Sequence, residues 1–252
     1  MKTKDSIRIK TPAEIDILRK AGKILALIIH ELECSLKSGM TTKDIDMKAD
    51  SLIRRENALS AFKGYRGFPG CACVSVNEEV VHGIPGFKVV KDGDIVSIDV
   101  GIIYDDYYSD TAITVGIGNI DPVRQKLLDV TRESLYKGIE QARPNNHLSD
   151  ISSAVQRHVE KNGFSVVRSF VGHGIGRQLH EEPEIPNYGA PHQGPVLKEG
   201  MVFAIEPMVN VGVYQTKILS DGWTVVTEDG KPSAHFEHTI AITSKGPEIL
   251  TQ

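Results

Sequence analysis

The sequence predicts an α+β fold made of two similar halves. One phrase occurs twice: Lys91-Asp92-Gly93 leads through an apolar run to Asp99, and Lys198-Glu199-Gly200 leads through a similar run to Glu206. Each apolar run indicates a buried strand, and each ends on a carboxylate. The predicted order is helices, strands, helices, strands, with no linker between halves of about 1–120 and 121–252. We therefore expect a single domain, 1–252, whose two sets of strands share one sheet.

Composition excludes several classes of protein. The chain has 252 residues, 25% of them charged and 40% hydrophobic, and a formal charge of -4. That charge gives no reason to expect nucleic-acid binding through a basic face. No stretch approaches the roughly 20 apolar residues of a membrane span, and Met1 to Asp5 leads into a polar segment without a signal peptide's apolar region. Three cysteines without a CxxC pair indicate reduced thiols, so we expect a cytoplasmic protein.

Each half is expected to begin with two helices. Thr11-Pro12-Ala13-Glu14 is a capping box with proline at the first helical position, and apolar residues at helical spacing extend that helix to about Leu36. A second helix starts at Thr42. In the second half, helices are expected from about Asp121 to Ala142 and from Ser149 to Asn162, the latter opened by Ser149 or Asp150.

The other segments alternate between strand patterns and turn residues. We expect strands at Cys71–Val76, Ile95–Val100, Ser109–Val115, Trp223–Val226 and His235–Ile242, with loops at Ala61–Pro69 and Asn77–Gly86.

Two acids in the first half are predicted to lie close together. Asp99 and Asp110 flank the turn Tyr104-Asp105-Asp106, so a hairpin would place them opposite each other or nearly so, about 5 Å apart. The flanking residues are apolar, which indicates a buried strand pair. Either one acid is protonated or a cation lies between them. Asp105 and Asp106 are expected to form the solvated tip of this hairpin.

Three later segments favour the cation. Gly172-His173-Gly174-Ile175-Gly176 removes bulk around one imidazole, Glu206 ends a buried strand, and Glu237 lies inside an apolar run. Four carboxylates and one imidazole suit two divalent ions such as Mn, Fe, Co or Zn. A mononuclear iron oxygenase would need two histidines and one carboxylate, which this set does not supply.

These motifs resemble those of type I methionine aminopeptidases of the bacterial short form, which have the creatinase/prolidase-like pita-bread fold. The resemblance covers essentially the whole chain. It rests on Asn77-Glu78-Glu79-Val80-Val81-His82-Gly83-Ile84-Pro85, Ile98-Asp99-Val100-Gly101, Ser109-Asp110-Thr111-Ala112, Gly172-His173-Gly174-Ile175-Gly176, His180-Glu181-Glu182-Pro183, Ala204-Ile205-Glu206-Pro207 and Glu237-His238-Thr239. It implies a pseudo-twofold fold with an antiparallel sheet core and two pairs of helices. The implied activity is hydrolysis of the initiator methionine from peptides and nascent proteins with a small second residue.

The resemblance also implies roles for single residues. The metal ligands would be Asp99, Asp110, His173, Glu206 and Glu237, with Asp110 and Glu237 bridging both ions. Glu206 would shuttle a proton to and from the attacking water, His180 would donate to the substrate's carbonyl oxygen, and His82 would contact the scissile amide nitrogen.

A methionine side chain needs an apolar pocket of limited depth. By resemblance its wall is formed by Tyr65, Phe68, Cys73, Leu179 and Trp223. Cys73 and Trp223 could also simply fill the core. Gln178-Leu179 stands where the family often has glycine and phenylalanine, and Phe68 and Val81 replace frequent Tyr and Cys. Loss of an aromatic wall at Leu179 is expected either to loosen the pocket or to shift the preference among residues that follow methionine.

Two sets of minor positions complete the expected site. Carbonyls near Ser97, Val100 and Ser233 match a monovalent-cation site (Na or K) of the family. The remaining histidines are expected to titrate in solvent (His30, His147, His158, His192, His235), except that His238 is expected to pack on the opposite strand face.

Three alternatives remain at this point. Proline dipeptidases and X-Pro aminopeptidases share the five ligands but usually carry an extra N-terminal domain, whereas about ten residues precede the first helix here. Type II methionine enzymes carry a helical insertion between His180 and Glu206, for which the segment is too short. A non-catalytic peptide-binding module of this fold would have lost ligands. We expect a monomer that meets nascent chains at the ribosome transiently.

Overall fold

The computed structural model describes residues 7–252, so the segment on which the signal-peptide prediction depends lies outside the described residues. The helices are α1 (Pro12–Ser35), α2 (Thr42–Arg55), α3 (Pro122–Ile139) and α4 (Leu148–Lys161), with a short 3₁₀ turn at Tyr65–Gly67. The strands are β1 (Leu59–Ser60), β2 (Ala72–Val76), β3 (Glu79–Val81), β4 (Ile95–Tyr104), β5 (Tyr107–Gly116), β6 (Ser165–Val166), β7 (Gly172–Gly174), β8 (Glu181–Ile185), β9 (Val202–Ile205), β10 (Met208–Asn210), β11 (Thr216–Ile218), β12 (Val225–Thr227), β13 (Ser233–His235), β14 (Glu237–Thr243) and β15 (Gly246–Ile249).

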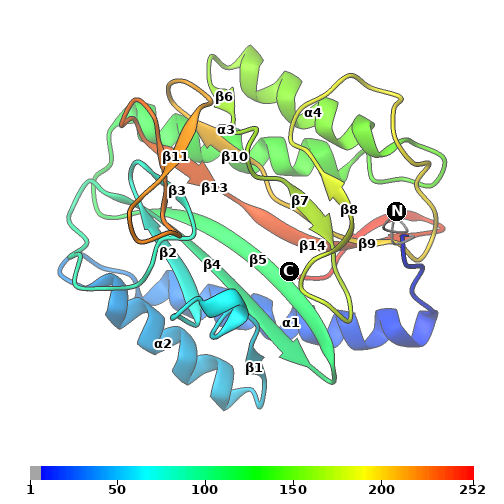
Figure 1. Cartoon of the computed structure of the whole chain (residues 1–252), viewed down its shortest axis with the longest axis horizontal. Coiled ribbons are helices and arrows are strands. Elements are labelled where there is room, and N and C mark those ends of the chain that lie inside the picture. The colour runs from blue at the N-terminus through cyan, green and yellow to red at the C-terminus, as the bar shows by residue number, and fades with distance from the viewer. Residues whose placement is uncertain (1–6) are drawn as a thin grey trace.

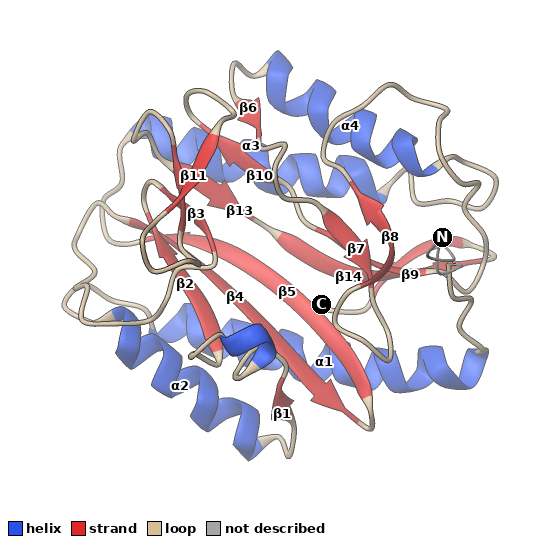
Figure 2. Cartoon of the chain, in the orientation of Figure 1, coloured by secondary structure: helices blue, strands red, loops and turns tan. Residues whose placement is uncertain are grey.

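One antiparallel sheet crosses both halves, as predicted. Its order is β1-β4-β5-β14-β9-β7-β8, with β2 also paired to β4 and β15 to β14. The halves meet where β14 pairs with β5. Two small sheets, β13-β10-β6 and β11-β12-β3, flank it. In Figure 1 α1 and α2 lie along the lower edge of the strands and α3 and α4 along the upper edge, and Figure 2 shows the strands gathered between the two helix pairs. This is the predicted α+β architecture with two pairs of helices.

The repeated phrase folds in the same way in both halves. Gly93 and Gly200 have nearly the same left-handed backbone, with φ of 89° and 88°. A residue with a Cβ would be strained in this conformation, which explains the glycine in both copies. A strand starts two residues later in each case, at Ile95 and at Val202.

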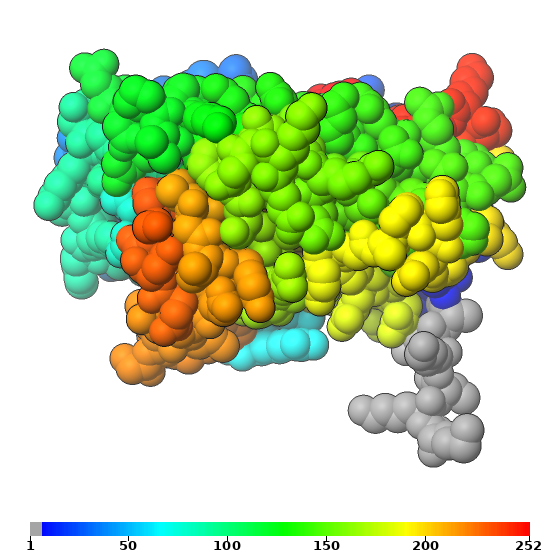
Figure 3. Space-filling model, turned by 90° about the horizontal axis from the view of Figure 1, so that it is seen from above, coloured from blue at the N-terminus to red at the C-terminus, as the bar shows by residue number. Residues whose placement is uncertain are grey.

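Each helix pair covers its own hydrophobic core. One core contains Leu25 of α1 and Ile45 of α2, and the other contains Leu127 of α3 and Val155 of α4. Ile113 of β5 packs against both cores. Seen from above, the second helix pair (green) lies between the loop after β8 (yellow) and the β11 hairpin (orange) (Figure 3).

Helix starts follow the capping signals in most cases. Thr11 caps α1 by accepting a hydrogen bond from Glu14 N, and Asp121 caps α3 in the same manner. The predicted opening residue of α4, Ser149 or Asp150, is two or three residues too late: His147 is the N-cap, because Asp150 Oδ2 reaches back to accept from His147 N at 2.8 Å.

Three predicted segments differ from the structure. Asn77–Gly86 is not all loop, since it contains β3. Trp223 lies before strand β12, in a turn where Asp221 accepts from Trp223 N at 2.8 Å. The strand predicted at His235–Ile242 is two strands, β13 and β14, separated at Phe236 because β13 pairs with β10 while β14 joins the large sheet. Short segments of this kind lack the periodicity that would separate them in sequence.

Among residues 7–252, no helix has both the length and the apolar character needed to cross a membrane.

Candidate metal and peptide site

The five predicted ligands converge on the large sheet. Asp99 comes from β4, Asp110 from β5, His173 from β7, Glu237 from the start of β14, and Glu206 directly follows β9. All five line one cavity of about 290 Å³. The pseudo-symmetric halves thus each contribute side chains to a single site.

Strand register explains how the acids meet. Ala112 of β5 lies opposite Asp99 on one side and opposite Glu237 on the other. Asp110 lies opposite Gly101, two residues from Asp99, so the pair is diagonal on one face of the sheet rather than directly opposed. Every second residue of a strand points to the same face, so Asp110 and Ala112 share it with their cross-strand partners.

Threonine hydroxyls align the junction between the halves. Thr239 Oγ1 accepts from Asp110 N at 3.1 Å and donates to Asp110 O at 2.7 Å. Thr111 Oγ1 donates to Glu237 O at 2.7 Å. These bonds extend the short β5–β14 pairing, and they hold the backbones of Asp110 and Glu237 in place.

The carboxylate oxygens and imidazole nitrogens of the site lie close enough together to bind a common metal ion. One oxygen each of Asp110 and Glu237 and one ring nitrogen of His173 lie within 4.8 Å of one another. His173 Nε2 is 3.5 Å from Glu206 Oε1. His173 Nδ1 lies 3.0 Å from Gly174 O. A neutral imidazole donating from Nδ1 keeps the Nε2 lone pair free for a metal.

Burial and mutual repulsion favour the uncharged acids when no cation is present. Burial raises the pKa of Asp110 to about 7. Burial, followed by repulsion from Asp110, raises the pKa values of Asp99, Glu206 and Glu237 well above their usual range. Burial lowers the pKa of His173 to about 4, so the ring is neutral near pH 7.

The residues present fit divalent metal ions. Asp99 Oδ1, Asp110 Oδ1 and Glu237 Oε1 are buried and have no hydrogen-bond partner among residues 7–252. Such orphaned buried oxygens are costly unless a partner compensates them. Four carboxylates and one imidazole form an oxygen-rich donor set suited to hard or borderline dications.

Removal of the metal is expected to make stability fall as pH rises above about 6.5. The folded acids hold protons that an unfolded chain releases near pH 4, so stability decreases as pH rises through the raised pKa values, about 7 for Asp110. The buried His173 and His235 have lowered pKa values of about 4 and 3, so they oppose this trend only below about pH 6.5. Thermal unfolding from pH 6.5 to 8.5 with EDTA should show the decline. Mn²⁺ should abolish it, because the ions bind the ionised carboxylates. A flat metal-free curve would contradict the expectation.

The five predicted pocket residues line the same cavity as the acids. Tyr65, Phe68, Cys73, Leu179 and Trp223 form its apolar part. The Phe68 and Trp223 rings meet edge to face with centroids 5.2 Å apart. Cys73 and Leu179 are 6% and 3% exposed, so they serve both the wall and the core.

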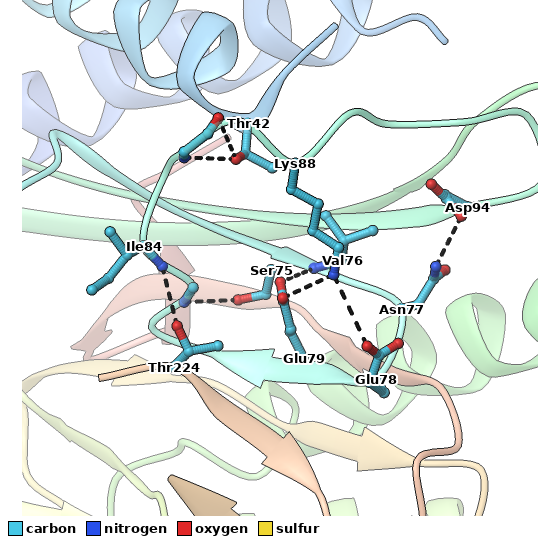
Figure 4. A network of polar contacts seen from close by, with 12 residues as sticks. Thr42, Ser75, Val76, Asn77, Glu78, Glu79, Ile84, Lys88, Asp94 and Thr224 are labelled. Atoms are coloured by element: carbon cyan, nitrogen blue, oxygen red, sulfur yellow. Dashed lines mark hydrogen bonds and ion pairs between the residues drawn. The ribbon is translucent and has the colours of Figure 1, made fainter. Parts of the chain in front are cut away.

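His82 projects into this cavity from a strained, well-anchored turn. Its φ of 59° is unusual for a residue with a side chain. Gly83 N donates to Ser75 Oγ at 3.1 Å, and Ile84 N donates to Thr224 Oγ1 at 3.4 Å (Figure 4). The His82 ring meets the Phe170 ring edge to face, with centroids 5.5 Å apart. Burial lowers the pKa of His82, which keeps the ring neutral.

His180 lies at the mouth of the cavity, bonded to Tyr65. The Tyr65 hydroxyl is 2.8 Å from His180 Nδ1, and the His173 and His180 rings are 4.3 Å apart. Partial burial, and then the nearby His173, Arg66 and His82, lower the pKa of His180 to about 3. If the tyrosine donates to Nδ1, the ring proton is on Nε2, where it can be donated to a ligand.

The sequence reasoning missed four residues at the site. Phe62, Arg66 and Phe170 also line the cavity. His235 was expected in solvent, but it is 2% exposed and its Nε2 lies 3.7 Å from Glu206 Oε2. The position of His235 in a strand pattern was the available signal. Phe62 and Phe170 lie in loops and Arg66 in the short 3₁₀ turn, and none of these segments has a periodicity that would have indicated the site.

A second cluster of potential ligands, His147, Asp150 and His192, lies at the start of α4. Both Asp150 oxygens accept backbone N–H bonds, from His147 N and His192 N, each at 2.8 Å. We interpret the cluster as a helix cap, with His192 exposed as predicted. His238 packs as predicted, with Nδ1 2.9 Å from Thr251 Oγ1.

A model of metallopeptidase family M24 matches residues 16–244. The chain belongs to this family. It is 57% identical to methionine aminopeptidase 1 of Bacillus subtilis over 243 residues, which cover 96% of this chain and 98% of the relative. It is 55% identical to a methionine aminopeptidase of Clostridium perfringens, over 97% of this chain and 98% of that one. Identity at this level over nearly the full length shows that this protein is an M24 metallo-exopeptidase of the methionine aminopeptidase type.

Solved M24 structures agree. The crystal structure of methionine aminopeptidase from Thermotoga maritima superposes with a TM-score of 0.96 at 49% identity, covering 98% of this chain and all of that one. The prolidase from Pyrococcus horikoshii shares the pita-bread fold, with a TM-score of 0.79 at 24% identity, but this chain covers only 65% of it. The predicted family and fold are confirmed, and prolidases match only as a fold.

Proposed function

We propose that this enzyme removes the N-terminal methionine from peptides and nascent proteins whose second residue is small, using two divalent ions. The main support is the placement of four buried carboxylates and one imidazole beside an apolar cavity of about 290 Å³. The ions would be held by Asp99, Asp110, His173, Glu206 and Glu237, and Mn, Fe, Co and Zn all suit this donor set. When bound, they supply a Lewis acid and a water molecule acidic enough to attack a peptide carbonyl.

Glu206 is the best placed of the acids to move a proton. Its side chain is 14% exposed and lies between two histidines, 3.5 Å from His173 Nε2 and 3.7 Å from His235 Nε2. A carboxylate at the cavity wall can accept a proton from the attacking water and pass it to the leaving amine.

Two neutral histidines would act on the scissile peptide bond. His180, with its Nδ1 held by Tyr65, would donate from Nε2 to the carbonyl oxygen and stabilise its developing negative charge. His82 would contact the amide nitrogen. Their lowered pKa values keep both rings neutral, so each can accept or donate one proton near pH 7.

Leu179 would set how closely the methionine side chain fits. We expect Leu179→Ala to raise KM for Met-Gly-Met-Met by about 10-fold with a smaller effect on kcat, because it removes part of the apolar wall. Steady-state kinetics would measure this. Leu59→Ala, at a position 67% exposed on the surface, is the control and should leave KM unchanged. A change in kcat alone would show that Leu179 does not form the pocket.

Substrate comparison tests the proposed function. The protein is stripped of metal, Mn or Co is added back, and release of methionine from Met-Gly-Met-Met is measured. We expect metal-dependent release from this peptide and none from Ala-Pro peptides. Release from Ala-Pro peptides alone would favour a prolidase-like activity, and no release at all would favour a non-catalytic binding role.

The wider setting follows from the same activity. We propose a cytoplasmic monomer that meets new chains at the ribosome, and a monovalent cation, Na or K, near the carbonyls of Ser97, Val100 and Ser233. Metal analysis of protein purified without added ions would identify the physiological dication, and gel filtration with light scattering would give the oligomeric state.

A further inference from the structure

A buried ion pair lies beneath the turn that carries Leu179 and His180. Lys10 Nζ donates to Glu181 Oε2 at 2.8 Å, and the two side chains are only 5% and 4% exposed. Glu181 Oε1 accepts the backbone N–H groups of Arg177 at 2.9 Å and Gln178 at 3.3 Å. The Glu181 carboxylate therefore holds the turn Arg177–His180, which directly precedes it in the chain.

Lys10 is itself fixed by the main chain on either side. Its N–H donates to Gly200 O at 2.7 Å, and it directly precedes Thr11, the N-cap of α1. The turn packs closely on the pair: a Cβ added at Gly176 would lie 2.7 Å from Lys10 Cε and 2.9 Å from Glu181 Oε1. The ion pair thus connects the start of α1 and the loop before β9 to the Arg177–His180 turn.

Neither Lys10 nor Glu181 lines the cavity that holds the five acids, so neither can contact the reacting atoms there. Leu179 and His180 do line it, and His180 is the residue before Glu181. Loss of the two bonds to Glu181 Oε1 would release the Arg177–Gln178 backbone, which leads directly to Leu179 and His180. An ion pair this deeply buried adds little net stability compared with apolar packing, whereas it restricts geometry.

We propose that Lys10 and Glu181 are positioning residues that hold the Arg177–His180 turn, so that His180 keeps its bond to Tyr65 and Leu179 keeps closing the cavity. This inference rests on the proposed function for its kinetic consequences. Burial lowers the pKa of Lys10, and the bond to Glu181 partly offsets this, so removal of Glu181 would leave the Lys10 charge buried and unpaired. Removal of Lys10 would leave the buried Glu181 carboxylate with only the exposed Arg8 guanidinium, whose Nη1 lies 3.8 Å from Glu181 Oε1. A test must therefore remove both charges together.

Two double variants separate positioning from folding. Lys10→Met with Glu181→Gln keeps a side-chain oxygen to accept from the turn, and Lys10→Met with Glu181→Met has none. We expect the Met–Met variant to lower kcat for Met-Gly-Met-Met by about 10-fold or more, since small misplacements of catalytic groups are costly. The Met–Gln variant should recover kcat to within about threefold of the unaltered enzyme. The amount of bound metal should be the same in both double variants and in the unaltered enzyme.

The same pair of variants in a His180→Ala background shows whether the effect passes through His180. Positioning predicts that the difference between them shrinks to less than about twofold, because coupled residues are not additive. A purely structural role would lower the unfolding temperature without changing kcat per folded molecule. Unaltered kcat in the Met–Met variant, or the same loss in both backgrounds, would overturn the inference.

An activity-independent measurement keeps this result separate from the proposed function. The ¹⁵N resonances of the His180 ring, assigned by their loss in His180→Ala, should shift in the Met–Met variant and remain in place in the Met–Gln variant. Identical His180 resonances in all proteins would overturn the inference even if methionine release is observed. Absence of methionine release from the unaltered protein would overturn the proposed function and leave the ring measurement to decide the positioning role.

Discussion

Asp110→Asn is expected to weaken divalent metal binding by more than about 100-fold and to lower methionine release by roughly 10³-fold. The Asp110 carboxylate lies among the other ligands, and repulsion from it contributes to the raised pKa values of Asp99, Glu206 and Glu237. An amide supplies neither the negative charge nor the anionic oxygens that a divalent ion would bind. Titration calorimetry with Mn²⁺ and the peptide assay would measure both effects.

The same substitution should have the opposite effect on the metal-free protein. Without the Asp110 charge the neighbouring acids repel less, so the metal-free variant should unfold at a higher temperature than the unaltered protein and gain less from added metal. Asp105→Asn is the matched control, since Asp105 lies at the exposed tip of the same hairpin with a left-handed backbone that asparagine tolerates. Equal metal affinity in Asp110→Asn and Asp105→Asn would contradict the ligand assignment.

His180→Ala is expected to lower kcat by about 10²-fold while both metal content and unfolding temperature stay nearly unchanged. The ring lies at the mouth of the cavity, 4.3 Å from the His173 ring, so its loss removes a donor to the carbonyl oxygen but no ligand. Steady-state assays at saturating peptide would measure kcat, and metal analysis would show whether the variant still binds its ions.

Two further variants sharpen this result. Tyr65→Phe should reduce kcat by about 10-fold or less, because it removes the hydroxyl that orients His180 Nδ1 while leaving the ring in place. His192→Ala removes a side chain that is 80% exposed and does not line the cavity, so this variant should behave as the unaltered enzyme. Undiminished turnover in His180→Ala would remove its proposed role.

Much of the site could be predicted because its residues violate ordinary sequence patterns. Asp99, Glu206 and Glu237 occur within or at the end of apolar runs, where an unpaired charge is rare, and His173 is surrounded by glycines. The repeat ending on Asp99 and Glu206 also predicted the similar halves, and the two turn glycines share one backbone conformation.

Other features depend on strand register and could not be predicted in the same way. The hairpin predicted Asp99 and Asp110 opposite each other or nearly so, and only the register gives the diagonal arrangement, with Gly101 opposite Asp110 and Ala112 opposite Asp99. The break at Phe236 between β13 and β14 follows from the different partners of those strands. Pairing partners distant in the chain have no local signal.

By itself, the sequence determined the α+β class and the set of acids, because strand and helix periodicity, capping residues and buried charges are local properties of the chain. The family followed from the resemblance of its motifs. The tertiary structure alone decided which side chains contact one another in and around the site: His235 beside Glu206, Tyr65 on His180, and Lys10 buried against Glu181. Residues 10 and 181 are joined only by folding. Their contact depends on long-range packing and desolvation, which cannot be predicted from the spacing of residues along the chain.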